Sequence, residues 1–168
     1  MYYISKYNSP VGKITLASNG PELTGLWFDG QKYFGANLPE ACEEKELPIF
    51  EKTKKWLNEY FSGKSPDFTP ALSMSGISSF RKRVWEILLS VPFGKTITYG
   101  QIAKEIEAET GKKVSAQAVG GAVGHNVISI IIPCHRVIGS DGSLTGYAGG
   151  TDKKAALLKL EHAGIVSE

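Results

Sequence analysis

Cys134 and His135 are neighbours in the chain, and they are the residue types best suited to nucleophilic chemistry. The thiolate is the reactive form of cysteine, and a free cysteine with a pKa of about 8.5 is mostly protonated at neutral pH. An imidazole activates such a thiol when a carboxylate fixes the imidazole tautomer. We expect Glu161 to supply this carboxylate, with Asp141 and Asp152 as alternatives. Because consecutive side chains of an extended segment point to opposite faces, we expect the thiol and the imidazole to communicate through a water molecule.

The other cysteine and histidine residues do not predict a metal site. A closed zinc site needs four cysteine or histidine ligands at characteristic spacings. The chain has two cysteines and three histidines, with neither a CxxC nor an HxxxH pair, so we expect no metal. It has no GxxxxGK[ST] phosphate loop either. An inert, buried thiol stays the alternative for Cys134, because the apolar residues IIIP precede it.

A glycine-rich loop, GYAGG at residues 146–150, follows the cysteine. Glycine permits close approach of the backbone, so such a loop brings backbone amides near a ligand. Tyr147 within the loop either stacks on a flat ring or covers the core.

The first part of the chain is predicted to form an antiparallel sheet and one helix. Three strand-like segments are joined by short turns, at residues 2–7, 12–18 and 22–28. An amphipathic helix is predicted from Leu47 to Phe61, and Gly63 suits its C-terminal cap. A segment rich in Pro, Ser and Gly follows and reads as a linker. We therefore expect two domains, at residues 1–75 and 76–168.

The second domain is predicted to be mostly helical. Its first helix follows Ser78 or Ser79, either of which suits the N-cap. Thr98 and Gln101 form a capping box for a second helix, and Ser115 suits the cap of a third. Two short helices joined by a turn of a few residues form a helix-turn-helix pattern.

An apolar strand and a last helix complete the second domain. The strand is predicted from Ile128 to Ile132 and leads directly to Cys134. The last helix is predicted to be capped by Thr151 or Asp152, and it carries Glu161. These two elements must bring the thiol and the carboxylate together.

The third helix contains Gly120, Gly121 and Gly124. Each glycine costs about 1 kcal/mol relative to alanine in a helix interior, so another interaction must offset the loss. Tight packing in the core is one explanation, and close approach to a DNA minor groove is the other. The helix has few large polar side chains, which argues against sequence-specific reading in the major groove.

The absence of membrane and signal segments predicts a cytoplasmic protein, and the charge distribution leaves an anionic partner open. Residues 1–75 hold 8 Lys and Arg against 9 Asp and Glu, whereas residues 76–168 hold 11 against 8. The excess suits an anionic partner for the second domain, although scatter on a solvated surface explains it as well. There is no apolar run near the length of a membrane span and no signal peptide in MYYISKYNSP.

Four segments of the second domain resemble the 6-O-methylguanine-DNA methyltransferases, a family of DNA-repair alkyltransferases. They are IIIPCHRVIGSDGSLTGYAGG, TYGQIA, AVGGAVGHN and LLKLEHAG, and they cover about residues 78–164. The resemblance implies an α/β two-domain fold. Its N-terminal part is a small antiparallel sheet with a helix, like ribonuclease H, and its C-terminal part is a mostly helical winged-helix or helix-turn-helix domain.

The resemblance also implies roles in the reaction. Cys134 would accept the alkyl group, and His135 would act as the base through a water molecule. Glu161 would orient the imidazole, and Asn126 would hold the turn between the third helix and the cysteine.

Substrate and DNA contacts follow from the same resemblance. The extruded guanine would lie against Tyr147, with the Ala148 amide on its oxygen and the carbonyls of Cys134 and Val137 on its amino group. Tyr99 would press on the backbone phosphate and help to rotate the nucleotide. The predicted DNA-binding residues are Gln117, Ala118, Gly121 and Arg136. Gln117 stands where the family usually has an arginine, Val127 where proline is common, and Ala148 where some members have serine.

Two other functions fit parts of the pattern. A thiol hydrolase would use Cys134, His135 and Glu161 for acyl transfer, but it leaves the helix-turn-helix unexplained. A DNA-binding regulator without chemistry would not need the cysteine. We therefore expect single-turnover, irreversible transfer of an alkyl group from O6 of guanine to Cys134. The expected partner is double-stranded DNA containing 6-O-alkylguanine, and the protein is expected to be a monomer without cofactors.

Overall fold

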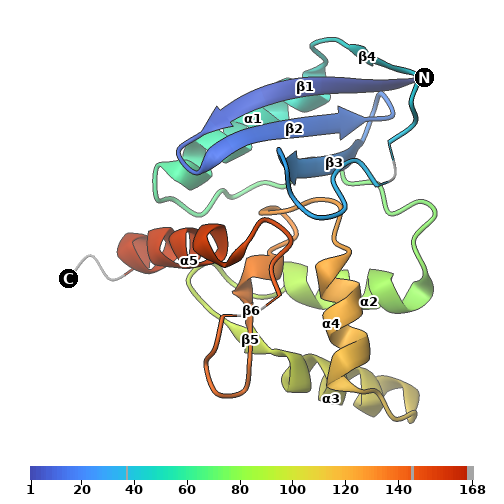
Figure 1. The fold of residues 1–168 in the computed structure, drawn as a ribbon, viewed down its shortest axis with the longest axis vertical. Coiled ribbons are helices and arrows are strands. Elements are labelled where there is room, and N and C mark those ends of the chain that lie inside the picture. Colours follow the sequence, from blue (N-terminus) through green and yellow to red (C-terminus); the bar gives the residue numbers. More distant parts are fainter. Residues whose placement is uncertain (37, 145, 166–168) are drawn as a thin grey trace.

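The computed structural model describes residues 1–36, 38–144 and 146–165. Figure 1 shows a sheet with one helix behind it and, beside them, a group of helices that carries the C-terminal half of the chain. This α/β arrangement of two domains confirms the predicted fold class. The boundary near residue 75 stays a prediction. In the part of the chain that the structure describes, no helix has both the length and the apolar character to cross a membrane.

The N-terminal sheet contains the three predicted strands and a short fourth strand. β1 (Tyr2–Ser9) pairs antiparallel with β2 (Gly12–Ser18), which pairs antiparallel with β3 (Leu23–Phe28). The unpredicted strand β4 (Cys42–Glu44) lies parallel to β1. Because the strand order is β3-β2-β1-β4, β3 and β4 form opposite edges of the sheet.

Helix α1 (Pro48–Phe61) follows the sheet and packs against it, as the apolar spacing predicts. Its buried side chains include Phe50, Leu57 and Tyr60. The helix ends at Phe61 with Ser62 as its C-cap, and Gly63 adopts a left-handed φ of 92°, which a glycine accepts without strain. β3 is buried along its whole length, because residues 71–73 pair with its start and the segment after residue 126 pairs with Leu26.

The C-terminal domain contains four helices among its described residues, and the caps predicted for the first three are present, whereas Thr151 and Asp152, the predicted caps of the last, lie inside its helix. The helices are α2 (Ser79–Leu89), α3 (Tyr99–Thr110), α4 (Ala116–Gly124) and α5 (Thr151–Ile165). The Ser78 and Ser115 hydroxyls accept from backbone N–H groups one turn on, and Thr98 and Gln101 form the reciprocal capping box. α3 and α4 form the helix-turn-helix. A two-stranded parallel sheet, β5 (Ile97–Thr98) with β6 (Val137–Ile138), joins the start of α3 to the cysteine segment.

The predicted strand from Ile128 to Ile132 is wrong, because this segment folds as a buried series of turns. Only a single bridge joins Ile128 to Leu26 of β3, and Ile130 has a left-handed φ of 70°, which is strained for a β-branched residue. The segment leads into η1 (Cys134–Arg136), a single turn of 3₁₀ helix. An apolar run signals burial, but it does not distinguish a strand from buried turns.

Candidate active site

Cys134 begins the 3₁₀ turn η1 and is almost fully buried. Burial raises the pKa of its thiol to about 11, while the Asn126 side chain and the charge of Lys154 act in the opposite direction. The thiol is therefore protonated at neutral pH, and it can react as a thiolate only if a base takes its proton.

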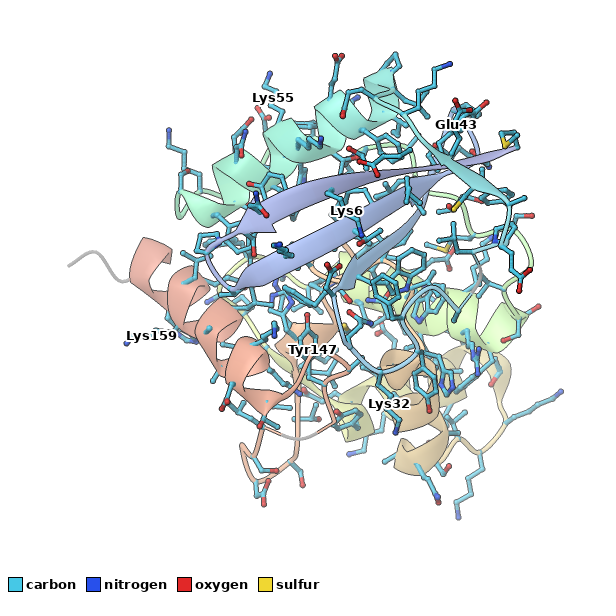
Figure 2. All side chains as sticks on the ribbon, turned by 45° about the horizontal axis from the view of Figure 1, so that its top comes forward. Lys6, Lys32, Glu43, Lys55, Tyr147 and Lys159 are labelled. Atoms are coloured by element: carbon cyan, nitrogen blue, oxygen red, sulfur yellow. The ribbon has the colours of Figure 1, made fainter. Side chains whose placement is uncertain are left out.

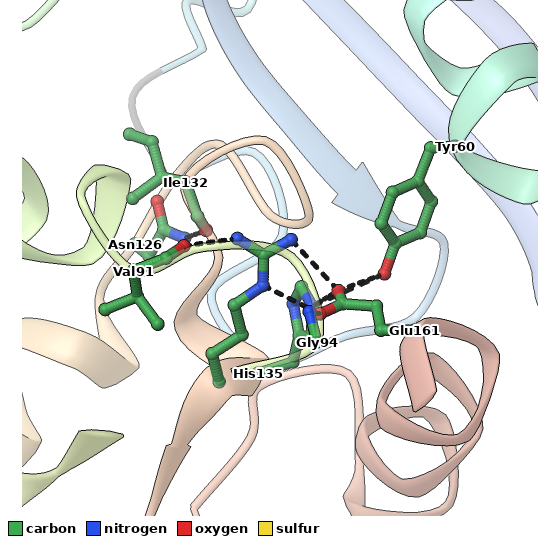
Figure 3. Close-up of polar contacts among 8 residues, drawn as sticks. Tyr60, Val91, Gly94, Asn126, Ile132, His135 and Glu161 are labelled. Carbon is green, nitrogen blue, oxygen red and sulfur yellow. Dashed lines mark hydrogen bonds and ion pairs between the residues drawn. The ribbon is translucent and has the colours of Figure 1, made fainter. Parts of the chain in front are cut away.

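The carboxylate of Glu161 lies at the centre of a buried cluster that Figure 3 draws. One oxygen, Oε2, lies 2.5 Å from His135 Nε2 and accepts a 2.6 Å hydrogen bond from the Tyr60 hydroxyl. The other oxygen, Oε1, accepts from Arg136 Nε at 2.8 Å and from the backbone N–H of Gly94 at 3.0 Å. Although burial alone raises it, the pKa of Glu161 is held at about 2 by His135 and Arg136, so the group is a carboxylate.

His135 is fully buried with its two ring nitrogens in different surroundings. Burial lowers its pKa, and the hydrogen bond to Glu161 opposes that shift only in part, so the imidazole is neutral at neutral pH. Since the ionised Glu161 only accepts hydrogen bonds, the ring proton is assigned to Nε2. Nδ1 then carries the free lone pair, and it has no hydrogen-bond partner among the described residues. The structure thus joins a neutral imidazole to an orienting carboxylate, and the buried thiol belongs to the preceding residue on η1.

Asn126 holds the turn between α4 and η1 with its side-chain amide. Its Nδ2 donates to the Ile132 carbonyl at 2.8 Å and to the Ile128 carbonyl at 3.3 Å. Its Oδ1 accepts from the Ile128 N–H at 2.9 Å. These bonds replace the ladder that a strand would have provided, so they fix the path of the chain into Cys134.

A cavity of about 270 Å³ opens between α4, the glycine-rich loop and the loop after β3. Its lining comprises Lys32, Tyr33, Gly120, Gly121, Gly124, His125, Gly146, Tyr147 and Ala148. Lys32 and Tyr147, both labelled in Figure 2, line it from the two domains. Cys134 is not among these residues, but the Tyr147 ring borders both the cavity and His135, whose ring centroid is 6.5 Å away. Tyr147 therefore lies where the cavity meets the Glu161 cluster.

The predicted DNA contacts on α4 lie on its exposed face. Gln117, Ala118 and Gly121 are all exposed, whereas the alternate face of the helix is buried. The glycines of the helix serve two purposes. A side chain at Gly120 would touch the Tyr99 ring at 3.9 Å, whereas nothing lies within 4 Å of one at Gly121. Gly120 is thus half-buried beside Tyr99, and Gly121 leaves open surface.

Tyr99, Val137 and Ala148, the other predicted substrate contacts, surround the same region. Tyr99 starts α3 and lies beside both α4 and Gly146 at the cavity lining. The Ala148 carbonyl accepts from the Lys32 N–H at 3.1 Å, which ties the loop to the N-terminal domain. Val137 is buried in β6, and its N–H donates to the Cys134 carbonyl.

Arg136 is placed differently from the prediction of a DNA contact. Its side chain is nearly buried, and the guanidinium donates to Glu161 and, at 2.7 Å, to the Val91 carbonyl. Because these bonds use the donors inside the protein, Arg136 is not available to the exposed face of α4. It belongs to the Glu161 cluster instead.

Two members of the site were missed by sequence reasoning. Tyr60 lies on α1, 101 positions from Glu161, and its place in an apolar stripe gave no sign of a polar role. Lys154 is a fully buried lysine on α5. Burial lowers its pKa, and the charge of Cys134 opposes this shift only in part. A usable signal existed for Lys154, because it stands seven residues before Glu161 and therefore on the same helix face.

Two family models of known proteins together match nearly the whole chain. The family model described as "6-O-methylguanine DNA methyltransferase, ribonuclease-like domain" matches residues 1–74. The model described as "6-O-methylguanine DNA methyltransferase, DNA binding domain" matches residues 79–163.

Relatives align over nearly their full length. A Methanosarcina barkeri protein named "Methylated-DNA--protein-cysteine methyltransferase" is 46% identical over 166 residues, covering 98% of this chain and 99% of the relative. A Mycobacterium tuberculosis protein of the same name is 43% identical over 162 residues, covering 96% and 93%. The crystal structure of M. tuberculosis OGT in complex with DNA matches with a TM-score of 0.83 at 41% identity, covering 97% of this chain and 93% of that one.

Proposed function

Since this chain belongs to the 6-O-methylguanine DNA methyltransferase family, we propose that it repairs alkylated DNA by moving the alkyl group from O6 of guanine onto Cys134. Its relatives are named for a methyl transfer from DNA to a protein cysteine. The observation that carries the assignment is the buried His135–Glu161 pair directly beside Cys134 on η1.

Cys134, and not Cys42, is the acceptor in this proposal. Cys42 lies on β4, the sheet edge opposite the one that contacts the C-terminal domain. Cys134 lies next to a base whose orientation is fixed by Glu161. Because a base must take the thiol proton before the sulfur can react, only the surroundings of Cys134 support nucleophilic attack.

The reaction is a displacement at the alkyl carbon. His135 Nδ1 takes the thiol proton, directly or through a water molecule, and the carboxylate of Glu161 stabilises the imidazolium that forms. The sulfur then forms a bond to the alkyl carbon as the bond from that carbon to O6 breaks. The electron pair goes to the guanine, which takes up, through solvent, the proton that His135 received, so that His135 becomes neutral again and Cys134 becomes a thioether. A thioether is not hydrolysed under mild conditions, so each molecule acts once.

The alkylated base must leave the duplex, because its alkyl group is unreachable inside the stack. We propose that the extruded guanine occupies the cavity beside Tyr147 and Ala148 and approaches Cys134 past the Tyr147 ring. The Ala148 amide would bind O6, and the carbonyls of Cys134 and Val137 would receive the amino group. Extrusion costs a few kcal/mol, which contacts within the cavity must offset.

The exposed face of α4 is the proposed DNA contact. Gln117, Ala118 and Gly121 present small or uncharged side chains, which suit close approach to a minor groove. Gln117 would fill the space left by the extruded base, and Tyr99 would press on the neighbouring phosphate.

We further propose that the protein acts in the cytoplasm as a monomer, with domains at residues 1–75 and 76–168. Reducing conditions there keep Cys134 as a thiol.

A titration of protein against damaged DNA tests the function and separates it from its alternatives. A duplex with one 6-O-methylguanine is added in excess, and repaired guanine is counted at the end point. The proposal predicts one repaired guanine for each protein molecule with wild type and with Cys42→Ser, and none with Cys134→Ser. Many turnovers for each molecule would indicate a thiol hydrolase, and binding without repair would indicate a regulator.

A further inference from the structure

Tyr60 belongs to the N-terminal domain, but its hydroxyl reaches into the catalytic cluster (Figure 3). The residue is fully buried on α1, and its hydroxyl donates a 2.6 Å hydrogen bond to Glu161 Oε2. The same carboxylate oxygen lies 2.5 Å from His135 Nε2, and the hydroxyl oxygen lies 3.4 Å from that nitrogen. A phenol and an imidazole thus share one oxygen of the carboxylate.

Rigid packing, and not the hydrogen bond alone, sets the position of the Tyr60 ring. The ring stacks on Trp56 at 5.3 Å between centroids, with an interplanar angle of 9°. The rings of Phe61 and Phe93 contact it edge-on at 5.2 and 5.8 Å. Burial, reinforced by the charge of Glu161, raises the pKa of Tyr60, so the hydroxyl stays a donor across the working pH range. The N-terminal domain therefore presents a fixed donor to the carboxylate.

We infer that Tyr60 is a positioning residue for alkyl transfer, acting on His135 through Glu161. The inference rests on the proposed function of Cys134. The hydroxyl holds Oε2 against the imidazole Nε2 and takes up part of the negative charge of the carboxylate. The first effect keeps Nδ1 oriented for the thiol proton, and the second limits how strongly Glu161 favours the imidazolium.

The inference predicts a change in the pH dependence of the reaction, which depends on every group that faces His135. These groups are Tyr60 on α1, Tyr147 on the loop before α5, Lys154 and Glu161 on α5, and the chain neighbours Cys134 and Arg136 on η1. Glu161 favours the protonated imidazole, whereas the positive charges of Arg136 and Lys154 oppose it. Removing the Tyr60 hydroxyl leaves more negative charge on Glu161, which raises the pKa of His135. In the variant, His135 is therefore protonated at a higher pH than in wild type, and a protonated imidazole cannot act as a base.

Tyr60→Phe tests this by deleting one oxygen atom. The rate constant for a single turnover on a duplex with one 6-O-methylguanine is measured from about pH 8.5 to about pH 5.5, where a histidine base titrates. We expect the variant to be about tenfold slower near pH 6, and the ratio of wild-type to variant rates to increase steadily as the pH falls. The amplitude of each reaction counts the active molecules, so partial unfolding does not affect the rate constant.

Tyr7→Phe is the matched control, because it removes a tyrosine hydroxyl from the same domain. That hydroxyl donates to Asn58 Oδ1 at 2.7 Å, on the surface. We expect its rate ratio to stay near one at every pH. In a Glu161→Gln background, Tyr60→Phe should not shift the pH dependence further, since the amide has no charge to share.

The outcomes separate this inference from the proposed function. Wild-type protein that transfers no methyl group contradicts the function itself. Active wild type with a rate ratio for Tyr60→Phe that is constant with pH overturns the inference alone, because a purely structural residue would give that result. A further pH shift in the Glu161→Gln background also overturns it.

Discussion

Tyr33 stacks on His125, with ring centroids 4.2 Å apart and an interplanar angle of 24°. Tyr33 belongs to the loop after β3, and His125 ends α4, the helix whose exposed face is the proposed DNA contact. Both line the cavity beside Tyr147. Tyr33 also adopts a left-handed φ of 61°, which is uncommon for a bulky residue. The N-terminal domain therefore forms part of the wall of the proposed nucleobase site.

Tyr33→Ala is expected to relax the size limit of this site. The change removes one wall of the cavity, so the ratio of transfer rates for 6-O-benzylguanine and 6-O-methylguanine should increase about threefold or more. Single-turnover rates on the two duplexes measure this ratio. Phe34→Ala is the control, because Phe34 is exposed on the same loop but contacts Trp27 instead. An equal ratio in wild type and Tyr33→Ala would show that the loop does not limit the substrate.

Gln117→Arg is expected to strengthen DNA binding and to make it more sensitive to salt. Gln117 is exposed on α4, so an arginine there can reach a phosphate without disturbing the core. One more neutralised phosphate steepens the slope of log K against log salt by about 0.9. Fluorescence anisotropy over a salt series measures the slope. Gln117→Leu should leave it unchanged, and an unchanged slope for Gln117→Arg would argue against a phosphate within reach of this position.

Asn126→Ala is expected to destabilise the protein by roughly 2–4 kcal/mol, because it leaves buried backbone groups of the turn without partners. Urea unfolding measures the loss, and transfer should also slow because the path into Cys134 is no longer fixed. Asn58→Ala is the control, because it removes an amide that accepts from the Tyr7 hydroxyl at the surface. Its loss in the free energy of unfolding should be well under half of that for Asn126→Ala. Similar losses for the two variants would contradict the role given to Asn126.

Stability should decrease in two stages as the pH falls. Burial lowers the pKa of His135 in the folded state, so the unfolded chain binds its proton first, and stability is lost as the pH falls below about 6.5. The pKa of Glu161 is held at about 2 in the folded protein, whereas it is near 4.5 in the unfolded chain. The contribution of Glu161 to the free energy of unfolding is therefore complete above pH 4.5 and is lost as the pH falls through 2. Urea midpoints measured against pH in wild type and Glu161→Gln test this. A variant that loses stability between these two values as steeply as wild type would contradict the second stage.

Much of the fold follows from local signals in the sequence. The caps at Ser78, Thr98 and Ser115 are short-range hydrogen bonds between a side chain and its own helix, so the residue types alone indicate them. β4 has no such local signal. Its three residues form a strand because the chain returns to the sheet beside β1 and pairs with it. The buried turns after Asn126 were misread as a strand, because the side-chain bonds that replace the ladder depend on tertiary position.

The same distinction between local and long-range contacts explains which residues of the candidate site the sequence could identify. Cys134 and His135 are recognisable as neighbours, and Glu161 as a carboxylate on the last helix. The hydroxyl of Tyr60 reaches them from another domain, and Arg136 turns inward to Glu161, so neither role was visible from spacing. Contacts between residues far apart in the chain decide these roles, and no local pattern encodes them.

Mass measurement of the reacted protein tests the central claim most directly. Protein is incubated with a duplex that carries one 6-O-methylguanine, and the intact chain and its peptides are then weighed. The account predicts a gain of the mass of one methylene group on the peptide that contains Cys134, with the peptide of Cys42 unchanged and no gain in Cys134→Ser. A methyl group that is lost from the DNA without appearing on Cys134 would contradict the account.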